Sequence, residues 1–411
     1  MIKNFLTYSL GAIILRLVMA SSVILTIKFI TPDQFGMLAL LNNLGIFLPI
    51  ILGLGLRQVL AIEFFGNKPT WILIWELNLI YLMFAIPAGL LLVFNLNYLN
   101  QILFCSKASP CVILLVILTS LLNFWPELLF QLLRFQNKSG LLASIQIAMG
   151  LLLASTTSYL LYFSKLGITS VLLAQLITQF TASLYFAYLL FKNYQDFNFP
   201  NIPLIKNYLK IGLPFIPNII LAWLILACNR WLLNWKLHNL TLVGIYSLSE
   251  NISLIFQTII TQPLMHSFLP HAFSNFAKNP SNLNKIDSQY QYYANIGILF
   301  LICLIPISFY LCKRILCFFL PDKYLQAIPL LSPLLIAQVI LAGTYISSAS
   351  LQYLKKTHLL IICMLISALL AILINLWLIP IYQVYSCPIA TCCAYSFYFG
   401  SIWLLKRKLL K

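Results

Sequence analysis

Charged residues are scarce in this chain. Asp, Glu, Lys and Arg make up 8% of its 411 residues, and only 8 residues are acidic. Soluble globular proteins carry about 25% charged residues, so a chain with an ordinary water-exposed surface is excluded. Apolar residues account for 62% of the chain, and a membrane-spanning helix needs about 20 of them in succession. The composition therefore predicts an all-α integral membrane protein with many spans.

Residues that carry out catalysis or bind metals are also few. The 4 histidines lie at the ends of apolar runs, and the chain has no Gly-rich phosphate loop or Walker lysine. The 10 cysteines lie almost entirely inside apolar runs or at their edges, and no pair has metal-ligand spacing with a nearby histidine. We therefore expect no enzyme activity, no cofactor and no metal site. An ATP-driven pump would need a partner that supplies the ATPase.

Long apolar runs separated by short polar breaks predict twelve transmembrane helices. Breaks such as GNKPT and NKSG hold the Gly, Pro, Asn and Lys that are typical of turns. The first run has no cleavage-like site and is long enough to span, so we expect it to be a retained helix. The predicted spans are 8–30, 36–61, 71–94, 111–133, 141–163, 168–191, 209–235, 242–269, 290–311, 324–349, 358–379 and 384–405.

Lys and Arg are distributed unevenly between alternate loops. The side that holds both termini has 15 of them and the opposite side has 7. The positive-inside rule therefore predicts that both termini are cytoplasmic. The net charge of +17 then reflects topology and contact with anionic membrane lipids. Nucleic-acid binding is not expected, because it would need a basic soluble face.

One polar break occurs twice, half a chain apart. KFITPDQFGMLAL begins at Lys28 and KLHNLTLVGIYSL at Lys236, and Gly36 matches Gly244 at the same offset of 208. Six predicted spans separate the copies, so the halves insert in the same orientation, and transporters place substrate between such halves. We predict an N-terminal six-helix lobe over 1–195, a cytoplasmic linker over 196–208 and a C-terminal six-helix lobe over 209–411.

Three segments resemble a known family. TPDQFGMLALLNNLGIFLPIILGLGLRQVLAIEFF, FFLPDKYLQAIPLLSPLLI and NLWLIPIYQVYSCPIATCCAY resemble motifs of bacterial polysaccharide exporters of the MOP superfamily, in the same order along the chain. The sequence departs from the last motif at Gln383 and at Ser386 and Cys387, where glycine and Gly-Ala are usual. The resemblance implies a V-shaped, MATE-like pair of bundles in the bacterial cytoplasmic (inner) membrane.

The same resemblance implies a function. It points to a Wzx-type flippase that translocates undecaprenyl-diphosphate-linked oligosaccharide, such as the O-antigen repeat unit of lipopolysaccharide, by alternating access through a cationic central cavity. A glycan polymerase and a chain-length regulator are the protein partners it implies. The alternative is a MATE-type cation-coupled multidrug antiporter. That branch uses acidic residues in helix 1 or helix 7, and the predicted spans 8–30 and 209–235 contain neither Asp nor Glu. A scaffold for glycan-assembling enzymes would leave the interior charges unexplained.

Charged side chains inside predicted spans carry the site hypothesis. A charge at the bilayer centre costs about 2.5–3.5 kcal/mol on insertion scales, so each one needs a reason. Arginine binds phosphate oxygens through its planar fork. We predict that substrate contacts come from Arg16, Arg57, Arg230, Asn123, Gln131, Asn218 and Gln257. Glu127 and Glu250 are predicted either to couple an ion or to form structural salt bridges.

The fourth predicted span has the most polar face. Ser120, Asn123, Glu127, Gln131 and Arg134 recur at steps of three and four, which places them on one side of a helix. Lipid would reject that stripe, so it is expected to face protein or a water-filled cavity. Pro126 allows a bend in this helix. By contrast, Glu63 and Glu76 lie near the predicted cytoplasmic edge and are expected to be solvated.

Overall fold

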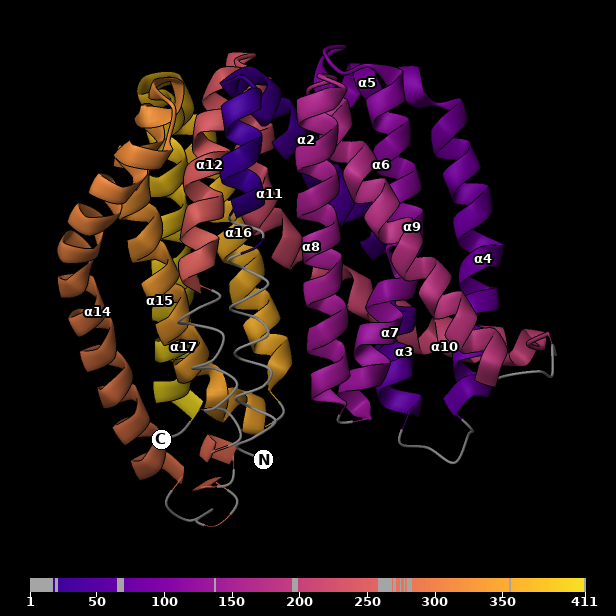
Figure 1. The fold of residues 1–411 in the computed structure, drawn as a ribbon. Coiled ribbons are helices and arrows are strands. Elements are labelled where there is room, and N and C mark those ends of the chain that lie inside the picture. Colours follow the sequence, from indigo (N-terminus) through magenta and orange to yellow (C-terminus); the bar gives the residue numbers. More distant parts are fainter. Residues whose placement is uncertain are drawn as a thin grey trace. The chain divides into compact units, whose positions relative to one another are not determined.

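The computed structural model describes residues 18, 21–64, 70–136, 138–193, 199–257, 268, 271–273, 275–276, 278, 283–354 and 356–409. Within these ranges the regular elements are helices and no strand occurs (Figure 1). Among the described residues, seven helical stretches are long and apolar enough to span a membrane, and the last of these, His358–Lys408, contains two helices. The predicted all-α class is confirmed, whereas the count of twelve spans stays a prediction.

The chain divides into two compact units. Unit 1 comprises Met1–Ile30 and Met37–Trp223, and unit 2 comprises Thr31–Gly36 and Leu224–Lys411. The lobe boundaries predicted from the sequence stay a prediction. In the structure, part of the predicted linker forms helix α10 (Ile202–Gly212), which packs within unit 1 against α3 (Leu56–Glu63).

Unit 1 is built from helices joined by short turns. In Figure 1, α4 stands at one edge of this unit with α6 and α9 beside it, and these three helices pack against one another. Its helices besides α3 and α10 are α2 (Pro32–Leu52, whose first turn belongs to unit 2), α4 (Thr70–Phe94), α5 (Leu96–Phe104), α6 (Pro110–Leu122), α7 (Phe124–Phe135), α8 (Ser139–Phe163), α9 (Ile168–Asn193) and the start of α11 (Ile216–Leu237).

The span predicted over 36–61 is not one continuous helix, because α2 and α3 are separate helices. Gly53–Gly55 form a turn between them, in which Leu54 has φ 49° and Gly55 has φ 68°. A positive φ costs glycine little, since it has no Cβ. A Cβ on Gly55 would also overlap the backbone of Gly212. Glycine at this turn therefore lets α10 approach the start of α3, the helix that carries Arg57.

The helix predicted over 111–133 is interrupted at Asn123, which separates α6 from α7. Pro126 has no N–H, so it cannot donate to the carbonyl of Leu122 four residues earlier. Ser183 Oγ lies 3.1 Å from that oxygen. The neighbouring carbonyl of Leu121 accepts a 2.7 Å hydrogen bond from the Tyr81 hydroxyl. The Tyr81 hydroxyl of α4 thus supplies a donor where the backbone of this helix is interrupted, whereas the Ser183 hydroxyl also contacts the Gln179 carbonyl of its own helix at 2.7 Å.

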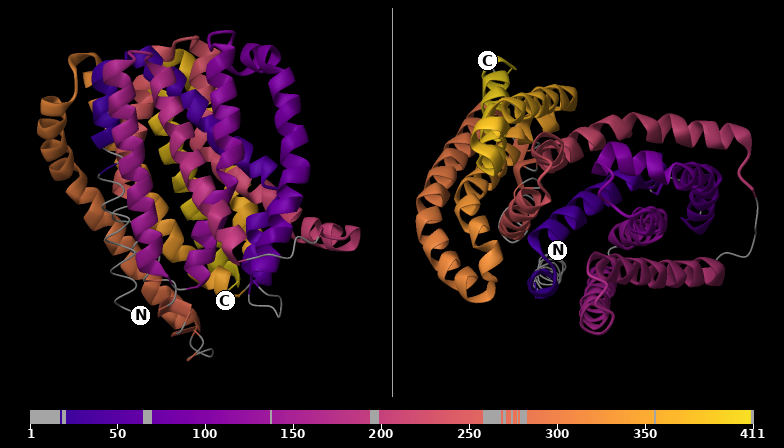
Figure 2. Two further views of the ribbon diagram at one scale, coloured as in Figure 1. Left: turned by 45° about the vertical axis from the view of Figure 1, so that its right-hand side comes forward. Right: turned by 90° about the horizontal axis from the view of Figure 1, so that it is seen from above.

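Glu76 is buried rather than solvated, which corrects the expectation from the sequence. Only 8% of its surface is exposed, and its Oε2 accepts a 2.9 Å hydrogen bond from the hydroxyl of Tyr208 on α10. Burial and the adjacent carboxylate of Glu76 raise the pKa of Tyr208, so the phenol keeps the proton that it donates. The amphipathic α10, which extends outward at the side of unit 1 in the left view of Figure 2, brings this donor to α4.

Unit 2 is organised around a central helix. Helix α15 (Ile328–Tyr353) packs against α14 (Leu283–Phe319), α17 (Ser386–Leu409) and α12 (Leu240–Phe256), and α16 (Thr357–Tyr382) packs against α17. Short 3-10 turns at Asp322–Ala327 and Gln383–Tyr385 lead into α15 and α17. Apolar clusters around Ala337 and Val339 of α15 fill the spaces between these helices.

The two copies of the repeated break begin their helices in related ways. Thr31 precedes α2 and donates its N–H to Gln34 Oε1 at 3.2 Å, one half of a capping box. Asn239 precedes α12 and caps it by accepting from the N–H of Leu242 at 3.3 Å. Asn239 is the residue that matches Thr31 at the offset of 208. Equivalent positions thus start equivalent helices in the two halves.

Candidate functional site

Arg57 and Glu127 form an ion pair within unit 1. Arg57 lies in the first turn of α3, and its Nη1 is 3.1 Å from Glu127 Oε2 on α7. The side chain of Gln131, one turn beyond Glu127, donates to the Arg57 carbonyl at 2.8 Å. The two charged side chains keep 31% and 40% of their surface exposed. This pair is therefore held in place and still accessible.

The polar stripe of the fourth predicted span faces the neighbouring helices α2 and α3. Besides the contacts of Glu127 and Gln131 with Arg57, Ser120 Oγ lies 3.4 Å from the carbonyl oxygen of Gly45 on α2. Asn123 is half-buried at the junction of α6 and α7, and Arg134 is exposed near the end of α7. The interruption at Asn123 and the turn at Gly55 bring the polar faces of these helices together.

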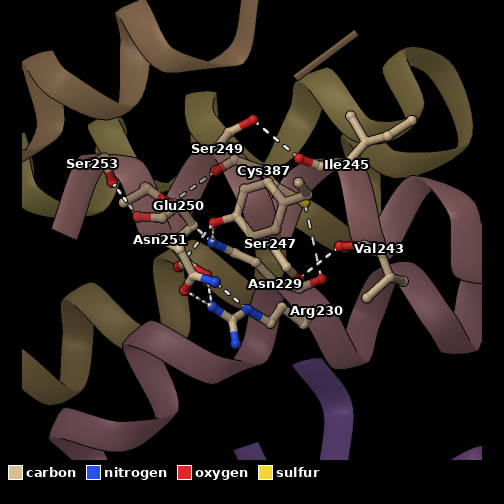
Figure 3. A network of polar contacts seen from close by, with 12 residues as sticks. Asn229, Arg230, Val243, Ile245, Ser247, Ser249, Glu250, Asn251, Ser253 and Cys387 are labelled. Carbon is tan, nitrogen blue, oxygen red and sulfur yellow. Dashed lines mark hydrogen bonds and ion pairs between the residues drawn. The ribbon is translucent and has the colours of Figure 1, made fainter. Parts of the chain in front are cut away.

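Arg230 and Glu250 form a second ion pair, in unit 2. Oε2 of Glu250 lies 2.8 Å from Arg230 Nε and 2.6 Å from Nη2, and Asn251 Oδ1 lies 3.5 Å from Nη2 (Figure 3). The side chains of the pair are only 9% and 7% exposed. A buried pair of this kind is strongly destabilised when one partner is removed, because the other charge is then uncompensated.

Asn229, next to Arg230, is the centre of a buried polar hub that joins four helices. Its Nδ2 donates to the Tyr246 hydroxyl at 2.7 Å and to Thr391 Oγ1 at 2.9 Å. Its Oδ1 accepts from Asn375 Nδ2 at 2.7 Å. The Tyr246 hydroxyl in turn donates to Glu250 Oε1 at 3.2 Å. The hub therefore links α11, α12, α16 and α17 to the ion pair through neutral groups.

The two ion pairs differ in burial, and this difference decides whether an incoming anion can reach the arginine. In the half-exposed pair of unit 1, an incoming anion can compete with Glu127 for the Arg57 guanidinium without first removing it from a sealed interior. In the buried pair of unit 2, the guanidinium already has two contacts with Glu250, and the carboxylate also accepts from Tyr246. The first pair is suited to exchange of anionic partners, and the second to fixing α11 against α12.

The residues predicted to bind substrate fall into two groups. Arg57, Glu127 and Gln131 come together in unit 1, with Asn123 four residues before Glu127, directly before the start of α7. Arg230 and Glu250 come together in unit 2, and Gln257 is half-buried at the end of α12, two turns after Glu250. Arg16 lies outside the described residues, as does the side chain of Asn218. Their predicted roles in substrate binding stay predictions.

Two polar features of unit 2 were missed in the sequence. Asn375 and Thr391 of the hub stand as single polar residues in apolar runs, and this isolation is a signal that could have found them, whereas Tyr246 lies directly before Ser247 in a more polar stretch. Lys406, counted among the cytoplasmic cations, is 3% exposed, and its Nζ lies 2.8 Å from Asp287 Oδ2 and 3.2 Å from Gln291 Oε1. This second buried ion pair ties the end of α17 to the start of α14. No sequence signal links residues so far apart.

Metal-ligating side chains do not gather in the part of the chain that the structure describes. No group of three or more His, Cys, Asp or Glu residues is close enough there to hold an ion. The thiol of Cys392 lies 2.9 Å from the backbone oxygen of Pro333. The contacts that the structure shows at the two arginine–glutamate sites are ion pairs and hydrogen bonds.

Solved transporters share this fold. An inward-facing multidrug resistance MATE family transporter of the MOP superfamily aligns with a TM-score of 0.76 at 14% identity, over 96% of this chain and 94% of that one. The lipid II flippase MurJ, in an inward closed conformation, aligns with a TM-score of 0.77 at 12% identity, over 99% of this chain and 88% of that one. A MOP superfamily transporter from Pyrococcus furiosus aligns with a TM-score of 0.56 at 14% identity, over 100% and 96%.

Sequence comparisons identify the family. No curated protein matches the chain significantly. A family model described as polysaccharide biosynthesis protein matches residues 25–329, about three quarters of the chain. The membrane-spanning helices, the MOP superfamily fold and this match agree with the resemblance read from the three sequence motifs. The chain is a multi-pass membrane protein that belongs to the polysaccharide biosynthesis protein family.

Proposed function

We propose that this protein is a flippase that translocates an undecaprenyl-diphosphate-linked oligosaccharide, such as an O-antigen repeat unit, from the cytoplasmic to the outer leaflet of the bacterial cytoplasmic membrane. The observation that carries the proposal is the match of residues 25–329 to the polysaccharide biosynthesis family. The likeness in fold to a lipid II flippase supports it, because lipid II is also a lipid-linked glycan. Arg16, Arg57 and Arg230 supply the positive charges, and polar side chains such as Gln131 the hydrogen bonds, that a diphosphate and sugar hydroxyls need.

Arg57 is the residue that we assign to first contact with the diphosphate. Its guanidinium is half-exposed and bound to a single carboxylate oxygen of Glu127 at 3.1 Å. A diphosphate presents several oxygens to the planar fork of arginine, so it can replace a monodentate carboxylate contact. Glu127 then regains the guanidinium when the substrate leaves. Binding at Arg230 would require its buried contacts with Glu250 to open first.

The membrane potential can drive this translocation. Moving one charge across 100 mV is worth about 2.3 kcal/mol. A diphosphate with two negative charges gains about twice that on leaving a negative interior, provided that the arginines stay behind. Glu127 and Glu250 are the residues at which a proton or another cation would couple. A glycan polymerase and a chain-length regulator are the partners that would receive the product.

The test is a comparison of two arginines of unit 1. We expect Arg57→Ala to abolish delivery of lipid-linked glycan to the outer leaflet, both in cells and in vesicles with a defined potential. Arg57→Lys keeps the charge without the fork and should retain part of the activity. Arg134→Ala, an exposed arginine near the end of α7, is the matched control and should transport normally. Full transport by Arg57→Ala at normal protein levels would contradict the role of Arg57.

The charges in predicted helices 1 and 7 argue against the antiporter alternative. Predicted helices 1 and 7 contain arginine and no acidic residue, so a cationic drug would meet positive charge where the antiporters present carboxylates. Deleting the gene should leave drug susceptibility unchanged and remove surface glycan. The opposite result, drug sensitivity with normal glycan, would favour the antiporter.

A further inference from the structure

A cavity of about 520 Å³ lies within unit 1, between α4, α6, α7 and α9. Its wall consists of apolar and aromatic side chains, among them Tyr81, Ala85, Leu121, Trp125 and Phe180. No charged residue contributes to it. The cavity is therefore complementary to an uncharged hydrocarbon, and it offers no charge to a phosphate and no exposed polar atom to the hydroxyls of a sugar.

The two aromatic residues that carry polar groups turn those groups away from the cavity. The Tyr81 hydroxyl donates to the Leu121 carbonyl at 2.7 Å, and the Trp125 indole N–H donates to Asn78 Oδ1 at 2.6 Å. The Tyr81 ring is also fixed by stacking on Phe124, with ring centroids 3.8 Å apart. The apolar wall is thus held in place by hydrogen bonds behind it.

The cavity lies at the middle of its helices. Tyr81 to Ile86 surround the centre of α4 (Thr70–Phe94), and Leu176 to Phe180 lie beside the centre of α9 (Ile168–Asn193). The contribution of α6 and α7, from Leu118 to Trp125, lies at the junction of the two helices. These positions lie within about one to two turns of the centres of helices that are long enough to span a membrane, and the centre of a spanning helix is expected near the bilayer midplane.

The mouth of the cavity is open to its surroundings. Ile86, Leu118, Ile177 and Phe180 belong to the wall and are 51%, 39%, 42% and 52% exposed. In the hydrocarbon core of a membrane such a mouth meets lipid chains rather than water.

We propose that this cavity holds a segment of the polyprenyl tail of the lipid-linked substrate, an inference that rests on the proposed function. The hydrocarbon core is about 30 Å thick, so the acyl chain of an ordinary lipid belongs to one leaflet and ends near the midplane. A long polyprenyl chain crosses the midplane. It can therefore occupy a midplane cavity while its diphosphate is in either leaflet, and the tail stays held while the headgroup crosses.

We expect the affinity of the cavity for the tail to be low. Lipid chains are as apolar as the wall of the cavity, so transfer from the bilayer gains no hydrophobic free energy. Only close packing against rings such as Trp125 and Phe180 favours the bound state. A carrier that must release its substrate benefits from this modest affinity.

The experiment uses the full chain in vesicles of phosphatidylethanolamine and phosphatidylglycerol. A polyprenyl monophosphate with a diazirine in mid-tail is the first probe, and phosphatidylglycerol with a diazirine in its acyl chain is the second. We expect the first probe to label residues 118–125 and 176–180 preferentially. Ile177→Trp should block the mouth and reduce this labelling about tenfold, or about 1.4 kcal/mol.

Leu184→Trp is the matched control. Leu184 lies two turns further along α9 on the same face, is 54% exposed and does not belong to the wall. Its replacement should leave the labelling unchanged. Ile86→Trp, at the α4 side of the mouth, provides a second blocked variant should Ile177→Trp not insert. Unchanged labelling in both blocked variants, or equal labelling by the acyl-chain probe, overturns the tail site.

The failure of this inference and of the proposed function are distinguishable. If the wild-type protein and Leu184→Trp deliver lipid-linked glycan, Arg57→Ala does not, and tail labelling is unspecific, then only the tail site is wrong. If the wild-type protein delivers no glycan, the proposed function is wrong, whatever the labelling pattern. Specific labelling in that case identifies a polyprenyl site with another purpose.

Discussion

Gly36 and Gly244 bring the backbones of α2 and α12 into direct contact within unit 2. A Cβ on Gly36 would overlap the carbonyl oxygen of Leu240, and a Cβ on Gly244 would overlap that of Pro32. Pro32 and Leu240 are related by the same offset of 208 as the two glycines. The contact is therefore reciprocal, as residues around a two-fold axis must be. The two copies of the repeated sequence break are therefore in contact with each other in the structure.

Alanine at either glycine should destabilise the protein. Gly36→Ala or Gly244→Ala forces backbone apart, because the overlapping atoms belong to carbonyl groups that cannot rotate away, and overpacking costs about 1–3 kcal/mol. Thermal unfolding in detergent measures the loss. Gly140→Ala is the control, since no atom lies within 4 Å of its added Cβ. Equal stability of Gly36→Ala and Gly140→Ala would show that the helices do not make this contact.

The two arginine–glutamate pairs should respond differently to truncation. Arg230→Ala leaves Glu250 buried and unpaired, which costs about 3–5 kcal/mol. Arg57→Ala removes a half-exposed pair, and exposed pairs are worth about 0–1 kcal/mol. We expect low protein levels and early unfolding for Arg230→Ala, and normal stability with lost transport for Arg57→Ala.

A paired replacement tests whether Arg230 serves structure alone. Arg230→Met combined with Glu250→Leu removes both charges and should restore stability relative to Arg230→Ala. Restored transport in this double variant would mean that Arg230 binds no substrate. Stable protein without transport would support the predicted binding role of Arg230 or the coupling role of Glu250.

Lys406 and Asp287 should behave as a unit. Their side chains are 4% and 7% exposed, so Lys406→Met or Asp287→Asn alone leaves the partner buried without its counter-charge. Each single change should lower stability by more than a change at the neighbouring exposed Arg407, whose Cζ lies 3.8 Å from the centre of the Trp403 ring. Exchanging the two residues, Lys406→Asp with Asp287→Lys, should recover part of the loss. A double-mutant cycle of unfolding temperatures measures it, and strict additivity would contradict the pairing.

Tyr81→Phe isolates one hydrogen bond behind the apolar cavity. Phenylalanine keeps the stacking on Phe124 but removes the donor to the Leu121 carbonyl. Hydrogen bonds between membrane helices are worth about 0.6 kcal/mol on average and up to about 1.7, so we expect a small loss of stability. Tyr81→Ala also removes the ring and should cost several times more. If the two variants are equally stable, the ring does not contribute.

The sequence by itself determined the class of structure and the residues that needed explaining. Apolar runs of about 20 residues form helices in a bilayer, because a helix hydrogen-bonds the backbone N–H and C=O groups within the segment where no water is available. Interior charges such as Arg57, Arg230, Glu127 and Glu250 stood out because the membrane penalises them. The offset of 208 between the two polar breaks was also visible in the sequence. Helix caps and turns depend on residues that are neighbours in the chain, so a repeated break leaves a repeated local pattern.

The tertiary structure alone decided how those charges are used. Whether Arg57 meets Glu127 or Arg230 meets Glu250 depends on which helices pack together, and helical periodicity carries no information about the partner. The same holds for Tyr208 with Glu76, for Lys406 with Asp287 and for the hub around Asn229, where residues up to 162 positions apart share hydrogen bonds. The burial of each ion pair was also decided only by helix packing. The Arg57–Glu127 pair is accessible and the Arg230–Glu250 pair is buried, although both consist of an arginine and a glutamate.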